Sequence, residues 1–182
     1  MLVIGVVGLP ASGKGEFSRI AAEMDIPVVV MGDIIRQAVE DAGLTLSDLN
    51  MGEVSRGLRE REGMDAIARR CMPVIEAMDA GVVLVDGIRG DAEVEAFRSH
   101  FADFVLIGIE STFETRLRRL SERGRPDDLL DGEELLLRDR REVSWGLDRA
   151  LSMADYILKN DSTLEAFTGT VRELLTRLRG MA

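Results

Sequence analysis

Five short apolar runs, rich in valine, isoleucine and leucine, recur along the chain, separated by longer stretches with apolar residues at helical spacing. Short runs without an alternating polar face are typical of strands buried on both sides. Amphipathic stretches between them favour helices that connect parallel strands. The pattern predicts an α/β fold, a five-stranded parallel sheet with helices on both faces. The expected strands are residues 2–7, 27–31, 82–85, 104–109 and 156–159.

Helix-start signals set the expected helices between these strands. Asp33 and Ser111 are each placed to cap a following helix, because a side-chain oxygen can accept a hydrogen bond from a free N–H group of the first turn. Residues 124–132 are expected to form a loop. Further start signals are Ser47, Asp48, Ser162 and Thr163. The expected helices are residues 16–24, 34–41, 64–78, 91–101, 112–123, 133–151 and 163–179, with helices and turns across 45–63.

The stretch between the first strand and the first helix carries the most specific motif. Gly8 and Gly13 let the backbone curl so that successive N–H groups point inward, and Lys14 follows at the start of a helix. These features together predict a loop that binds nucleotide phosphates. The alternative is a glycine-rich turn without a ligand. The loop comprises Gly8, Leu9, Pro10, Ala11, Ser12, Gly13, Lys14 and Gly15.

The positions after Lys14 depart from the usual pattern. Such a loop normally continues with a serine or threonine whose hydroxyl binds Mg²⁺, whereas Gly15 and Glu16 stand here. The Glu16 carboxylate could bind the metal directly or merely favour the helix N-terminus. Asp86, directly after the third apolar run, is the other candidate metal ligand, with a turn or cap aspartate as the alternative.

Composition narrows the possible partners. The 182 residues, 46% of them hydrophobic, suit a single domain, 1–182. A net charge of −10 argues against a broad surface for nucleic acid or acidic membrane, so a bound anion needs local positive charge. The single cysteine, Cys71, suits a buried position in a reducing compartment, and the first apolar run is too short to cross a membrane. We expect a cytoplasmic monomer or homodimer.

Arginines supply that local charge. Arg36 and Arg89 follow the second and third expected strands closely, and their forked guanidinium groups suit a second anion site. Most arginines of 116–141 alternate with acidic residues, which favours a salt-bridged helical surface. Arg125 differs, because it lies on a glycine-hinged loop that could close over a transferring phosphoryl group.

Over nearly the whole chain these motifs resemble the nucleoside monophosphate kinases of adenylate-kinase type. The final strand and its loop are also similar to those of dephospho-coenzyme A kinases, and the chain as a whole is most similar to small archaeal kinase-like P-loop proteins. The matching segments are Gly13-Lys14-Gly15 (phosphate loop), 31–36 (acceptor segment), Asp86-Gly87-Ile88-Arg89 (their Asp-Gly-x-x-Arg), 125–128 with 138–141 (a shortened lid) and 154–165 (the border of the donor adenine).

The resemblance implies a P-loop NTPase fold, a helical acceptor-binding region at 33–80 and a short lid at 123–141. The donor-side residues that it implies are Lys14 with the loop amides for the phosphates of ATP, Asp86 and Glu16 for Mg²⁺, and Asn160 near the adenine. On the acceptor side it implies Asp33, Arg36, Arg89 and Glu93, with Arg125, Arg138 and Arg141 acting from the lid.

Two departures concern the acceptor. Met31 stands where adenylate kinases have a threonine, and Glu93 stands where they have a glutamine that reads adenine. A carboxylate only accepts hydrogen bonds. If Glu93 reads the acceptor base, we expect a base that offers donors, cytosine or guanine; the alternative is a solvated helix face.

The sequence therefore predicts an enzyme that uses ATP and Mg²⁺ to phosphorylate a small phosphorylated nucleotide, without a protein nucleophile. One alternative is a dephospho-coenzyme A kinase-like enzyme with a ribose hydroxyl as acceptor. The other is a regulatory or assembly ATPase with a macromolecular partner. ATP consumption that rises with one small acceptor would distinguish a kinase from such an ATPase.

Overall fold

A computed structural model describes residues 1–123 and 132–181. Its centre is a parallel five-stranded sheet in the order β2-β3-β1-β4-β5, which confirms the expected fold class. The strands are β1 (Leu2–Val7), β2 (Val28–Val30), β3 (Val82–Ile88), β4 (Phe104–Glu110) and β5 (Tyr156–Lys159). Because the chain moves from β1 first to one side and then to the other, the crevice at the carboxyl end of β1 is the favoured place for a ligand.

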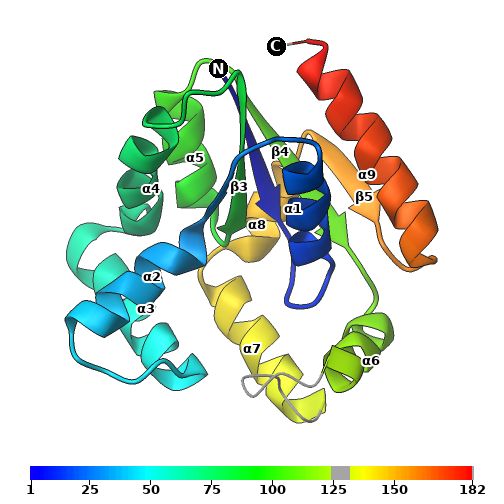
Figure 1. The fold of residues 1–182 in the computed structure, drawn as a ribbon. Coiled ribbons are helices and arrows are strands. Elements are labelled where there is room, and N and C mark those ends of the chain that lie inside the picture. Colours follow the sequence, from blue (N-terminus) through cyan, green and yellow to red (C-terminus); the bar gives the residue numbers. More distant parts are fainter. Residues whose placement is uncertain (124–131, 182) are drawn as a thin grey trace.

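Helices cover both faces of the sheet (Figure 1). Two of them, α1 and α9, pack on one face, whereas α4, α5 and α8 pack on the other. None of the helices in the described ranges is both long and apolar enough to cross a lipid bilayer. The helices are α1 (Lys14–Glu23), α2 (Met31–Asp41), α3 (Asp48–Glu62), α4 (Ala66–Glu76), α5 (Asp91–His100), α6 (Phe113–Arg123), α7 (Gly132–Ser144), α8 (Leu147–Ser152) and α9 (Leu164–Arg179).

The central strand β1 divides its side chains between two apolar cores. Val3 and Val7 belong to the core under α4 and α5, whereas Ile4 and Val6 belong to the core under α1 and α9. This alternation follows from the two-residue period of a strand. Cys71, on α4, is fully buried in the first core, and burial raises the pKa of its thiol to about 12. The expectation of a buried, unreactive cysteine is confirmed.

Two expected helix caps are wrong. Strand β2 runs straight into α2, so Asp33 already lies in the first helical turn and Val30 stands at the N-cap without a side-chain bond.

The expected cap of α6 is made by the residue after Ser111. Ser111 Oγ lies 3.0 Å from Asn160 O and 2.8 Å from Asp161 Oδ1. Thr112 Oγ1 instead accepts from Thr115 N at the start of α6. The caps expected from Ser47 and Thr163 are confirmed, since each hydroxyl accepts from a backbone N–H of its helix.

The helix expected across 133–151 is divided into α7 and α8. Gly146 lies between them with φ +94°, a left-handed conformation that glycine adopts at little cost. A Cβ at this position would also lie 2.1 Å from Asp91 Oδ1 at the start of α5, so that carboxylate would have to move. The break lets α8 stay on the sheet while α7 extends beyond the carboxyl ends of the strands (Figure 1).

Gly90 fixes the contact between the β3–α5 loop and the end of α7. A Cβ on Gly90 would lie 2.4 Å from the carbonyl oxygen of Trp145. We expect Gly90→Ala to lower the free energy of unfolding by about 1–3 kcal/mol, because the backbone must shift. Gly169→Ala on α9 is the matched control, since its Cβ would meet nothing within 4 Å, and it should raise stability by up to about 1 kcal/mol. Urea unfolding of both variants tests this, and equal stability would contradict it.

Candidate functional site

The loop between β1 and α1 packs closely against Asn160, which follows β5. Gly13 has φ +117°, and a Cβ there would lie 2.2 Å from the amide nitrogen of Asn160. That nitrogen donates to Ser12 O at 2.8 Å, while Arg119 donates to Asn160 Oδ1. Asn160 is buried and its carboxamide is engaged in supporting the loop. Direct contact between Asn160 and a cofactor stays a prediction, whereas its support of the loop is observed.

Lys14 folds over its own loop. Its Nζ donates to Gly8 O at 2.6 Å and to Leu9 O at 3.0 Å. Burial lowers the pKa of this ammonium to about 8, although the nearby Glu142 carboxylate favours the charged form. Ser12 Oγ is buried and meets no hydrogen-bond partner within the described ranges. The loop thus offers a lysine and a helix N-terminus to an anion.

A cavity of about 570 Å³ lies over this loop. Gly8, Leu9 and Ser12, which were expected at the ligand, do not line the cavity and instead shape the loop. The expected residues that do line it are Pro10, Ala11, Gly13, Lys14, Gly15, Glu16, Arg36, Asp86, Arg89 and Arg138.

The two candidate metal ligands have different surroundings. Asp86 lies within β3, opposite Val30 and Val6, and lines the cavity. Glu16 lies on the rim, where both of its oxygens accept from Arg19, at 3.0 and 2.5 Å. Glu16 is therefore paired with an arginine on its own helix. Asp86 is the better placed of the two carboxylates to bind a metal ion in the cavity.

A second cavity, of about 380 Å³, adjoins the first. Its apolar wall comes from Ile35, Leu46, Met51 and Trp145. The two cavities share four lining residues, and three of them are the arginines Arg36, Arg89 and Arg138, with Gly32 as the fourth. Arg141 lines the second cavity only. Asp33 lines neither; it is exposed and pairs with Arg36.

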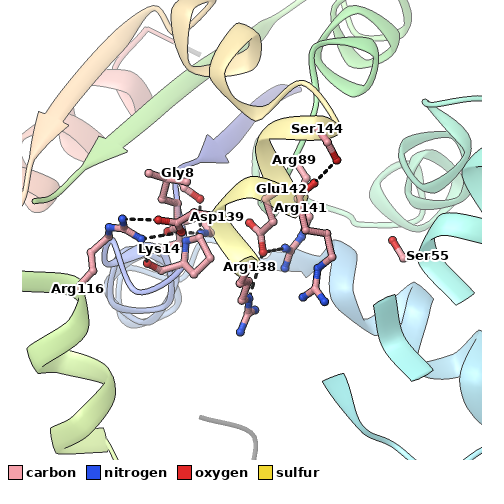
Figure 2. A network of polar contacts seen from close by, with 12 residues as sticks. Gly8, Lys14, Ser55, Arg89, Arg116, Arg138, Asp139, Arg141, Glu142 and Ser144 are labelled. Carbon is pink, nitrogen blue, oxygen red and sulfur yellow. Dashed lines mark hydrogen bonds and ion pairs between the residues drawn. The ribbon is translucent and has the colours of Figure 1, made fainter. Parts of the chain in front are cut away.

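A buried carboxylate, Glu142, lies beside Arg89 and Arg138, two of the arginines that the cavities share (Figure 2). Glu142 Oε1 accepts from Arg89 and from Arg138 Nε, and only 1% of the Glu142 surface is exposed. Burial alone would raise the pKa of Glu142, but Arg89, Lys14 and Arg138 outweigh it and hold this pKa below its ordinary value. Glu142 in turn raises the pKa of Arg89. These contacts fix two guanidinium groups at the boundary.

The prediction that Glu93 reads an acceptor base is wrong. Glu93 is fully buried on α5, so the alternative of a solvated face is wrong as well. Its Oε1 accepts from Arg59 Nη2 at 2.7 Å, and its Oε2 accepts from the backbone N–H of Arg89 at 2.8 Å. The Arg59 guanidinium lies 4.7 Å from the centre of the Trp145 ring. Glu93 therefore holds the backbone at Arg89 and lines neither of the two cavities.

Two arginines of α6 support the loop and were not distinguished by the sequence. Arg116 donates to Pro10 O and forms a two-pronged pair with Asp139, at 2.9 and 2.7 Å. Arg119 donates to Ala11 O, Ser12 O and Asn160. In the sequence both belong to a run of alternating charges, which gives no sign of contact with a distant loop. Arg125, the expected lid residue, lies outside the described residues.

Comparisons with known proteins identify the family. A family model described as an AAA domain matches residues 4–141. A UPF0200 protein of Methanoculleus marisnigri is 59% identical over 180 residues, which cover 99% of this chain and 98% of that protein. The chain belongs to the UPF0200 family. A UPF0200 protein of Methanoregula boonei is 58% identical over 175 residues, covering 96% of each chain.

Solved structures similar to this UPF0200 chain include small-molecule kinases. Shikimate kinase from Bacteroides thetaiotaomicron aligns with a TM-score of 0.65 and 18% identity, over 96% of this chain and 98% of that one. Dephospho-CoA kinase from Campylobacter jejuni aligns with a TM-score of 0.62 and 16% identity, over 99% and 98%. At these identities the likeness shows the fold, which is of the P-loop kinase type.

The residues of the site fit ATP and Mg²⁺. A triphosphate would find Lys14 and the N-terminus of α1 at one end of the larger cavity. The described residues contain no group of three or more metal-ligating His, Cys, Asp or Glu side chains. Mg²⁺ needs no such group, because it is usually held by one or two carboxylates, waters and the phosphates themselves. Asp86 would supply the carboxylate, and the bound ion would neutralise phosphate charge.

Lys14 should make nucleotide binding depend on pH. With a pKa of about 8 in the free protein, Lys14 is mainly charged at neutral pH and loses its proton as the pH rises. Phosphate prefers the charged form, so affinity for a non-hydrolysable ATP analogue should fall above pH 8, at most about tenfold per pH unit. Calorimetric titration across this range measures the fall. Lys14→Arg should give a flatter profile, and an equally steep one would contradict the assignment to Lys14.

Proposed function

We propose that this chain is an ATP- and Mg²⁺-dependent phosphotransferase, similar to nucleoside monophosphate kinases, that phosphorylates a small phosphorylated acceptor such as a nucleotide. The donor would occupy the cavity over the loop, and the acceptor would occupy the adjoining one. Helical region 33–80 would then form the acceptor site, and residues 123–141, with Arg125, would form a short lid.

The shared boundary of the two cavities carries this proposal. Arg36, Arg89 and Arg138 line both the cavity that contains Lys14 and the cavity beside it. Direct phosphoryl transfer requires donor and acceptor to meet in line, with positive charge where the transferring group passes. Guanidinium groups at the meeting point supply that charge in a fixed orientation. Hydrolysis alone would need only the first cavity.

A phosphate acceptor suits the boundary better than a hydroxyl acceptor. A hydroxyl acceptor benefits from a base whose pKa lies near the working pH. The carboxylate between Arg89 and Arg138 is Glu142, and its pKa is held below the ordinary value by these arginines and Lys14. A phosphate arrives already ionised and needs no base, while the arginines match its charge. The dephospho-coenzyme A kinase-like alternative therefore ranks second.

Release of ADP from ATP across a panel of nucleoside monophosphates and dephospho-coenzyme A tests the proposal. We expect strong stimulation by one nucleoside monophosphate and loss of that stimulation in Lys14→Ala. Trp145, the single tryptophan of the chain, lines the proposed acceptor cavity, so its fluorescence should report binding of the same compound. Slow ADP release that no acceptor changes would support the ATPase alternative and contradict the kinase proposal.

A further inference from the structure

One hydroxyl of α1 reaches the candidate metal carboxylate. Ser18 lies one helical turn after Lys14, and its Oγ donates to Asp86 Oδ2 at 2.9 Å. The same Oγ lies 3.0 Å from Lys14 O. A serine hydroxyl has a single proton, and both of these oxygens are acceptors. The proton is thus shared between the carboxylate and the carbonyl that carries the loop lysine, so Ser18 joins α1 to β3 directly beneath the cavity.

The neighbouring positions of α1 cannot make this contact. Gly15 has no side chain, and both carboxylate oxygens of Glu16 are engaged by Arg19 on the outer rim. The hydroxyl normally found beside the loop lysine is therefore absent, although Asp86 lines the cavity as a metal-binding carboxylate would. Ser18 is the hydroxyl on this helix that contacts Asp86.

We propose that Ser18 is a positioning residue for Mg²⁺, which holds Asp86 Oδ2 so that Oδ1 is presented to the ion or to its bound water. Groups that hold a metal ligand in place from behind fix its orientation and tune its affinity. In this chain Ser18 compensates, from one turn further along α1, for the hydroxyl missing at position 15 or 16. The inference rests on the proposed function, because it presumes a bound Mg²⁺–nucleotide complex.

Mn²⁺ binding in the presence of a non-hydrolysable ATP analogue tests this role without turnover. Electron paramagnetic resonance should show wild type binding Mn²⁺ with the analogue, and Ser18→Ala binding it about tenfold more weakly, the lower end of the effect typical for such supporting groups. Ser18→Thr keeps the hydroxyl and should restore most of the affinity. Urea unfolding should show that Ser18→Ala still unfolds cooperatively, because alanine favours a helix interior and offsets part of the lost hydrogen bond to Asp86.

Two controls separate positioning of Asp86 from other effects. Ser152→Ala removes a helical hydroxyl that also bonds the carbonyl four residues back, at 2.9 Å from Asp148 O, but is remote from Asp86; it should leave Mn²⁺ affinity unchanged. In an Asp86→Asn background, Ser18→Ala should cause no further loss. Equal Mn²⁺ affinity of Ser18→Ala and wild type, or additive losses in the double variant, would overturn this inference alone. Absence of any Mn²⁺–analogue binding by wild type would overturn the proposed function with it.

Discussion

Arg89→Ala is expected to lower kcat with the preferred acceptor by about 10²- to 10³-fold, the usual cost of removing one donor that stabilises transition-state charge. Arg89 lines both cavities, and its guanidinium is held by the buried Glu142 carboxylate. Arg89→Lys keeps the charge but loses the forked geometry, so an intermediate rate is expected. Initial rates at saturating ATP, with acceptor concentration varied, measure both kcat and KM.

Arg172→Ala is the matched control for Arg89. Arg172 is an exposed arginine of α9 that pairs with Glu23 at 2.6 Å and lines neither of the two cavities. Its removal should leave the rate within about twofold of wild type, since an exposed pair contributes little. A similar loss in both variants, or wild-type activity of Arg89→Ala, would contradict the assignment of the transfer zone to the shared boundary.

Arg59→Met is expected to lower the free energy of unfolding by about 3–5 kcal/mol, because it strands a buried charge. Arg59 and Glu93 pair at 2.7 Å with 3% and 1% of their side-chain surfaces exposed. Without Arg59, the Glu93 carboxylate keeps a single hydrogen bond within the described residues, from the Arg89 backbone N–H. The variant also removes the guanidinium that lies over the Trp145 ring. Urea unfolding followed by far-ultraviolet circular dichroism measures the change.

The double variant Arg59→Met, Glu93→Gln tests the cause of that loss. It removes the stranded charge but retains an oxygen for the Arg89 N–H, so it should be clearly more stable than Arg59→Met alone. Arg172→Met, in an exposed pair, should change stability by less than about 1 kcal/mol. If the double variant were less stable than the single one, the buried pair would not be the source of the effect.

The fold could be predicted because its signals are local. Each strand is an apolar run of a few residues, and amphipathic helical stretches connect these runs, so the pattern alone indicated a parallel sheet. The break between α7 and α8 was not predicted, because Gly146 inside an amphipathic pattern resembles a tolerated helical glycine. Its left-handed φ and its close approach to Asp91 depend on how the helices pack, which the local sequence pattern does not report.

Site residues could be predicted only where they belong to a recognisable motif or directly follow a predicted strand. The spacing around Lys14 and the positions of Asp86, Arg36 and Arg89 after strands were visible in the sequence. Glu142 was not, because one acidic residue among alternating charges has no local mark of burial. Glu93 was assigned to the ligand through its likeness to a glutamine position, whereas its pairing with Arg59, on another helix, decides its role.

The central claim, direct transfer between two adjoining cavities, is tested best by following the γ-phosphoryl group itself. ATP labelled at the γ-phosphate is incubated with Mg²⁺, the protein and the acceptor that most stimulates ADP release, and the labelled products are separated. The account predicts that the label appears on the acceptor, in amounts matching the ADP formed. Label found only in inorganic phosphate, whichever acceptor is supplied, would contradict it.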